Sequence, residues 1–323
     1  MPKNIINDPA GAILEYLYLT QSKNDNKYLE REEWRKLNAP KFAQLVWNGS
    51  LEPHVLIYNI QGNQRNAAQK AQINRTLKKL EQYDLIESYT LDDSIDTKKK
   101  VITLVGEDLF LRNRYLEYIH GGQYIIDKWK KSVAKFFIPN EKGIGTGFLI
   151  SPNRVATAKH VVDDLKDFKI QFENDPNVYE VSNIIRPTLI NDLDLAIIEL
   201  PENVKGIEPF TTEIDRNILE EIVVLGYPPI PMSDDAYLIA SKGEVSAIIS
   251  KYTNDIQHLI ISTFVRGGNS GGPIINRRGD VIGIVTENLY NKINHEEDGL
   301  NEGLGFSAGI VSEWLDDLNN GKI

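Results

Sequence analysis

The spacing of the apolar residues changes part-way along this chain, and that change most constrains its fold. Over residues 9–114 the apolar positions recur mainly at intervals of three and four, as they do on one face of a helix. Beyond His120 the interval becomes two, in short runs separated by turn residues. The sequence therefore predicts a mainly α domain over residues 1–122 and an all-β domain over residues 123–323.

The N-terminal part contains a helix followed by a hairpin pattern. Ile73, Leu77 and Leu80 form an apolar stripe, and two β-type runs at 87–91 and 101–105 are separated by polar turn residues. A further helix is expected from about Glu107 to Tyr118. Helices followed by a hairpin are similar to the winged helix-turn-helix fold, a resemblance that covers about residues 10–118, with an insertion expected near residues 40–66.

The pattern of the C-terminal part predicts an antiparallel barrel or sandwich, because its apolar runs are short and are separated by turn residues. The expected strands are Val133–Ile138, Gly147–Ile150, Lys169–Phe172, Ala196–Leu200, Ile222–Leu225 and Val281–Val285. The segment VSEWLDDLNN predicts a short C-terminal helix.

Composition and charge narrow the class of protein. There is no cysteine, so disulfides, thiol nucleophiles and thiolate metal sites are excluded. No export signal or membrane span is expected, and a reducing cytoplasm is the predicted location. The first 125 residues carry 17 Lys and Arg against 16 Asp and Glu, a charge of +1, whereas the remainder has 19 against 30, a charge of −11. Nucleic acid is therefore not expected on the C-terminal domain.

Three segments of the C-terminal part contain candidate catalytic side chains, in the order His, Asp, Ser. His160 ends the segment TAKH, behind the glycine-rich run GTGFLI. Asp194 lies in NDLDLAIIEL, immediately before an apolar strand pattern. Asp192 stands two residues earlier and is interpreted as a solvated loop carboxylate. Ser270 lies in RGGNSGGPIIN.

The glycines around Ser270 suit a nucleophile loop. They permit a tight turn that exposes the hydroxyl, and they let the backbone amides of Gly268 and Ser270 point at a developing oxyanion. A Walker-type phosphate loop would carry Lys followed by Ser or Thr after its glycines, and this segment does not.

Together these motifs resemble the trypsin-like serine protease family, most closely its bacterial branch of high-temperature-requirement proteases, over about residues 130–315. The resemblance implies a double β-barrel and a serine endopeptidase that acts on protein substrates without a metal or cofactor. It assigns Ser270 as nucleophile, His160 as base, Asp194 as orienting carboxylate, and Gly268 and Ser270 as the oxyanion donors. Asn269 stands where animal relatives carry aspartate, so a zymogen switch is not expected.

The resemblance also locates a substrate pocket. Phe264 falls at its base, where trypsin carries an acidic residue, and Thr286 and Glu287 fall on its wall. Glu287 could favour a basic substrate side chain, although a surface carboxylate is more often simply solvated.

The N-terminal domain is predicted to regulate the protease by binding a partner. Arg75, Lys78 and Lys79 could contact phosphates, but the domain is nearly neutral, so docking of a protein is favoured over DNA. The alternatives are a DNA-binding regulator with a degenerate or rarely active protease fold, or an interaction module within a complex.

Overall fold

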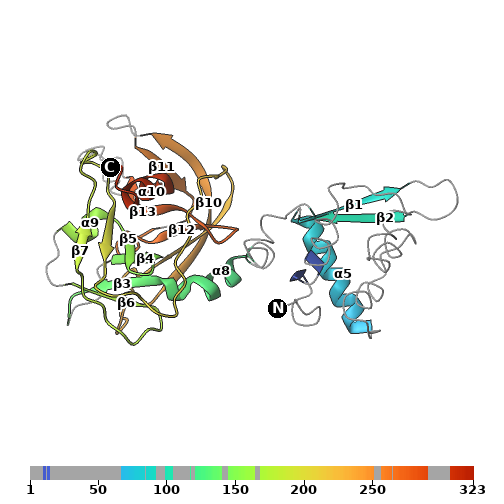
Figure 1. Cartoon of the computed structure of the whole chain (residues 1–323), viewed down its shortest axis with the longest axis horizontal. Coiled ribbons are helices and arrows are strands. Elements are labelled where there is room, and N and C mark those ends of the chain that lie inside the picture. Colours follow the sequence, from blue (N-terminus) through green and yellow to red (C-terminus); the bar gives the residue numbers. More distant parts are fainter. Residues whose placement is uncertain are drawn as a thin grey trace, which may run out of the picture. The chain divides into compact units, whose positions relative to one another are not determined.

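The fold was determined as a computed structural model, which divides into two compact units, Met1–His120 and Gly121–Ile323 (Figure 1). The residues that the structure describes are 10–11, 13–14, 67–83, 85–91, 99–104, 117, 121–139, 145–163, 168–250, 256–263, 265–289 and 306–323.

The first unit contains the expected helix and hairpin. Helix α5 spans Ala67–Gln82, and the strands β1 (Ile86–Leu91) and β2 (Lys99–Leu104) pair antiparallel with Ile86 opposite Leu104. Leu77 and Leu80 are buried, as the apolar stripe predicts. The helix expected at 107–118 and the insertion near 40–66 lie outside the described residues, apart from Glu117, and the winged-helix assignment stays a prediction.

The second unit begins with a helix that the sequence analysis did not predict. Helix α8 spans Gly122–Trp129 and is followed by a 3-10 turn, Lys130–Ser132. Ile125 and Trp129 are buried, and Trp129 stacks on Phe210 with ring centroids 4.5 Å apart. The helix has only two turns and starts at glycines that usually mark a break, so its periodicity is hard to see in the sequence.

The first β region is a six-stranded antiparallel sheet in the order β6-β3-β4-β5-β8-β7. Its strands are β3 (Val133–Phe137), β4 (Gly145–Ser151), β5 (Arg154–Thr157), β6 (Lys169–Phe172), β7 (Asn183–Ile185) and β8 (Ala196–Glu199). The double barrel predicted from the resemblance is thus only partly closed here by strand pairing. Ile170 of the edge strand β6 also forms an isolated antiparallel bridge with Tyr179, which lies in the segment between β6 and β7.

The second β region is a closed barrel in the order β10-β11-β14-β13-β12-β9. Its strands are β9 (Glu221–Gly226), β10 (Ile239–Ser250), β11 (Gln257–Ile261), β12 (Pro273–Asn276), β13 (Val281–Leu289) and β14 (Phe306–Val311). Helix α10 (Ser312–Asn319) follows β14 and confirms the predicted C-terminal helix. Branched aliphatic side chains, including Val224, Ile274 and Ile282, fill the barrel.

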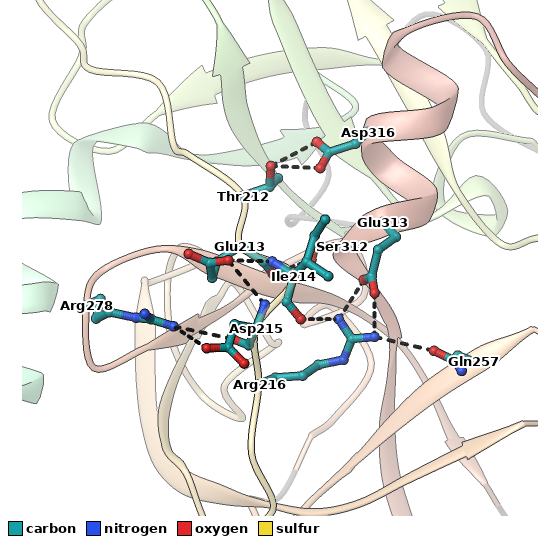
Figure 2. A network of polar contacts seen from close by, with 10 residues as sticks. All are labelled: Thr212, Glu213, Ile214, Asp215, Arg216, Gln257, Arg278, Ser312, Glu313 and Asp316. Atoms are coloured by element: carbon teal, nitrogen blue, oxygen red, sulfur yellow. Dashed lines mark hydrogen bonds and ion pairs between the residues drawn. The ribbon is translucent and has the colours of Figure 1, made fainter. Parts of the chain in front are cut away.

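A polar network fastens the segment between the two β regions to helix α10, as Figure 2 shows. Arg216 makes two 2.6 Å contacts to Glu313, and Thr212 donates to Asp316 at 2.8 Å. The guanidinium also donates to the Ile214 carbonyl at 2.8 Å. The side chain of Arg216 is only 8% exposed, so this ion pair is better shielded from water than an ordinary surface pair.

In the part of the chain that the structure describes, no helix is long and apolar enough to cross a membrane.

Candidate active site

His160 and Asp194 are held together by two hydrogen bonds. His160 lies in the short helix α9 (Lys159–Asp163), and Asp194 precedes β8. The backbone amide of His160 donates to Asp194 Oδ1 at 2.9 Å, and the ring Nδ1 lies 2.7 Å from Oδ2. An ionised carboxylate can only accept, so this contact assigns the ring proton to Nδ1. Nε2 is then left as the atom that can take up a proton.

Asp194, and not Asp192, is the carboxylate that meets the histidine. Leu193 and Leu195 are fully buried in the core on either side of Asp194, and the amide of Leu195 donates to the Leu193 carbonyl at 2.9 Å. These contacts anchor the backbone that carries Asp194. Asp192 is exposed to solvent, as the sequence analysis expected.

Ser270 lies on a tight turn that only glycine can complete. Gly268 and Gly271 have φ values of +91° and +83°, a region that other residues rarely adopt. A Cβ on Gly271 would lie 2.1 Å from the Thr146 carbonyl and 2.2 Å from Thr157 Oγ1. A side chain there would displace backbone, so the glycine pattern has a steric cause.

The same packing brings the Ser270 loop against the segment that leads to His160. The Cβ position of Gly271 is 2.9 Å from the amide nitrogen of Ala158, two residues before the histidine. Ser270 itself is half-buried, and its hydroxyl makes a long 3.5 Å contact to the Thr286 carbonyl. A bond of this length holds the hydroxyl weakly, which leaves it able to turn towards another partner.

The amides next to Ser270 divide into two groups. Those of Asn269 and Gly271 donate to the carbonyls of Arg266 and Val285, at 3.0 and 2.7 Å. The amides of Gly268 and Ser270 donate to no acceptor among the residues that the structure describes. These are the two donors that the sequence analysis selected for an oxyanion.

The predicted substrate pocket is described only in part. Thr286 is buried in β13, and its hydroxyl has no hydrogen-bond partner within the described ranges. Glu287 also lies in β13, opposite Ala308, but its side chain is outside what the structure describes, as is the whole of Phe264. The pocket therefore stays a prediction.

The three basic residues singled out for phosphate contacts lie on a single helix. Arg75, Lys78 and Lys79 are all exposed on α5, in which Leu77 and Leu80 are buried. The three side chains are thus available to a partner of the N-terminal unit.

Sequence reasoning missed two residues that support the Ser270 loop. Thr146 is fully buried and bonds to the loop from β4, although the motif GTGFLI had been noted only as a glycine-rich strand. Tyr227 is buried behind Gly268, and its hydroxyl donates to Glu173 at 2.7 Å. Burial and this carboxylate raise the pKa of Tyr227, so its hydroxyl stays protonated. A polar residue between two glycines at a strand start was the available signal for Thr146.

Among the described residues, no group of three His, Asp or Glu side chains is arranged to hold a metal ion.

Comparison with known proteins shows what the second unit resembles. Residues 145–284 match the trypsin-like peptidase domain. The chain is 28% identical over 185 residues to Protease Do-like 2 of the Arabidopsis thaliana chloroplast, and the match covers 55% of this chain and 28% of that protein. The second unit is therefore similar to a trypsin-like peptidase domain, and the match spans little more than a quarter of the curated relative.

Solved structures with a similar chain path include two bacterial proteases. The active form of the Rv3671c protease from M. tuberculosis is 22% identical, with a TM-score of 0.48, and the match covers 61% of this chain and 82% of that one. The serine endoprotease from Yersinia pestis is 18% identical, with a TM-score of 0.47 and coverages of 62% and 65%.

Proposed function

We propose that this chain hydrolyses peptide bonds in protein substrates through Ser270, His160 and Asp194. The observation that carries the proposal is the pair of hydrogen bonds that fixes His160 on Asp194, next to the loop that presents Ser270. His160 Nε2 takes the hydroxyl proton as Oγ attacks the scissile carbonyl, and then returns it to the leaving amine. An acyl-enzyme forms on Ser270 and is released by water.

The amides of Gly268 and Ser270 are the proposed oxyanion donors. Each such donor typically lowers the barrier by about 3 kcal/mol, because it is already oriented where negative charge develops. The amides of Asn269 and Gly271 already donate to the carbonyls of Arg266 and Val285, which leaves these two for the substrate.

Covalent labelling tests this assignment directly. The intact protein, its mass confirmed, is expected to react with a fluorophosphonate, and peptide mapping is expected to place the label on Ser270. Ser270→Ala should abolish labelling, yet change the free energy of unfolding by no more than about 0.5 kcal/mol because its hydroxyl bond is long.

Ser250→Ala is the matched control, because Ser250 is an exposed serine of the same barrel, and this variant should label normally. Labelling that persists in Ser270→Ala would contradict the nucleophile assignment. Labelling confined to a truncated form that begins near residue 130 would contradict activity without processing.

We further propose that the N-terminal unit is a winged-helix-like module that regulates the protease by docking another protein. The support is the exposed face of α5 and the antiparallel hairpin that follows it. A charge of +1 over the first 125 residues favours a protein over DNA as the partner.

Duplex binding by the full chain, titrated with salt, distinguishes the two partners. Affinity that falls steeply with salt and weakens in Lys78→Ala and Lys79→Ala would show phosphate contacts and overturn the preference for protein. No binding at low salt is the expected result.

A further inference from the structure

Thr146 bonds to the Ser270 loop through two of its three polar atoms. Its hydroxyl donates to the Gly268 carbonyl at 2.6 Å and accepts from the Tyr227 amide at 2.9 Å. Its amide donates to the Ser270 carbonyl at 3.0 Å, and its carbonyl accepts from the Thr157 hydroxyl at 2.7 Å. The side chain is fully buried, so water cannot replace any of these partners.

These contacts hold the loop at Gly268 and at Ser270 itself. Thr146 belongs to β4 of the six-stranded sheet, whereas Gly268 and Ser270 lie in the loop that precedes β12 of the closed barrel. The carbonyls it holds are those of the same two residues whose amides are the proposed oxyanion donors. Because a peptide unit is planar, holding these two carbonyls fixes the peptide units 268–269 and 270–271. The Ser270 amide belongs to the unit between these two, and the Gly268 amide to the unit just before them, so both donors adjoin backbone that Thr146 holds.

Two glycines allow backbone to pass close to Thr146. A Cβ added at Gly226 would lie 3.2 Å from the Thr146 hydroxyl, and one added at Gly272 would lie 3.4 Å from its methyl group. Because the hydroxyl is buried and bonded to Gly268, the loop cannot tilt away from Thr146 without breaking a buried hydrogen bond.

Thr157 extends the connection to the base. It is fully buried at the end of β5, three residues before His160, and its hydroxyl holds the Thr146 carbonyl. Thr157 and Thr146 thus connect the segment that leads to His160 with the loop that carries Ser270. The bond from Thr146 to Gly268 joins residues that are 122 positions apart in the sequence.

We propose that Thr146 is a positioning residue for the oxyanion site, an inference that rests on the proposed function. Its hydroxyl sets the orientation of the Gly268 and Ser270 amides, and so acts on the transition state through the loop without touching substrate. A donor must lie about 2.7–3.1 Å from the oxyanion, so a small tilt of the loop is costly to the rate.

The test compares Thr146→Val, which removes the hydroxyl at nearly equal volume, with Thr146→Ser, which keeps it. With fluorescein-labelled casein, kcat of the valine variant is expected to fall about 10- to 100-fold while KM changes less than about threefold. Its rate of fluorophosphonate labelling should fall by a similar factor. The serine variant should stay within about threefold of the unmodified protein.

The pH profile separates positioning from general damage. The His160–Asp194 pair does not contact the Thr146 side chain through any bond described above, so the midpoint of the profile should be unchanged in both variants. If the valine variant does not fold, Thr146→Ala removes the same hydroxyl without placing a methyl group against two polar backbone groups, and the same loss of kcat is expected.

Three outcomes would overturn the inference. These are an unchanged kcat without the hydroxyl, an equal loss in Thr146→Ser, or an effect confined to KM. If the unmodified protein neither labels nor cleaves casein, the proposed function itself fails, which is a separate result from an active protein that is insensitive to Thr146.

Discussion

The six-stranded sheet and the closed barrel contribute to the candidate site in different ways. The sheet supplies two side chains, His160 and Asp194, which are partly exposed and fix each other through direct hydrogen bonds. The barrel supplies Ser270 on a loop of backbone, whose shape depends on glycines and on atoms of the sheet. The pair is therefore a local arrangement, whereas the nucleophile loop depends on both β regions being folded together.

The largest effect on the rate that this comparison predicts is at Asp194. Asp194→Asn should lower kcat/KM by about 10⁴-fold, because an amide at this place favours the wrong histidine tautomer. Asp192→Asn is the matched control, since Asp192 is an exposed carboxylate two residues away, and it should change the rate less than about threefold. Casein hydrolysis measures both. Opposite behaviour of the two variants would shift the site by two residues.

An intermediate effect on stability is expected at the ion pair that joins helix α10 to the segment between the two β regions. Arg216→Ala removes a shielded partner of Glu313 and should lower the free energy of unfolding by about 2 kcal/mol, between the values typical of exposed and buried ion pairs. Chemical denaturation of the full chain gives this number.

Arg278→Ala is the control for that change, because the nearest carboxylate oxygen of Asp215 is 3.9 Å away and Asp215 is largely exposed. Its effect should not exceed about 0.5 kcal/mol. Equal losses in the two variants would show that the Arg216–Glu313 pair contributes no more to stability than the exposed Arg278–Asp215 pair of the same network (Figure 2).

The smallest effect concerns Asp316, on α10. Burial is the main reason that the pKa of this carboxyl is raised, so its stabilising contribution is present at low pH and is lost as pH rises through the folded-state pKa. Asp316→Asn stays neutral and can still accept from Thr212. It should raise stability at pH 7 by about 0.5 kcal/mol or less.

Thermal melting at pH 7 and below pH 4 checks this sign, because the gain should vanish in acid, where the aspartic acid is also neutral. Asp317→Asn serves as the control, since Asp317 pairs with Lys322 at 2.8 Å and should gain nothing. A destabilised Asp316→Asn protein at pH 7 would contradict the expectation.

Local patterns were enough to predict much of this architecture. Alternating apolar residues predicted the strands around Ala196 and Val281, and the apolar run that directly follows Asp194 distinguished it from Asp192. The glycines around Ser270 predicted a tight turn. Gly268 and Gly271 do adopt positive φ values, which other residues rarely take.

Features that depend on distant pairs could not be predicted in this way. Nothing in the local pattern of GTGFLI shows that Thr146 will bond to Gly268, because that contact is created by the packing of two β regions. Likewise, the alternation of apolar residues does not reveal which of the two sheets closes into a barrel. Closure depends on which segments pair, and the bridge between Ile170 and Tyr179 cannot be recognised from the sequence of either segment alone. Helix α8 was missed because tertiary burial of Trp129, rather than a long periodic pattern, defines it.

The strand order of the closed barrel has a consequence for synthesis on the ribosome. The sheet that holds His160 and Asp194 uses strands between residues 133 and 199, so it can pair early, whereas the barrel requires β14 between β11 and β13. The Ser270 loop is therefore translated before the last strand that completes its barrel. Because chains fold from the N-terminus as they emerge, we expect the Ser270 loop to be organised last, which would keep a protease that acts through Ser270 from attacking its own growing chain.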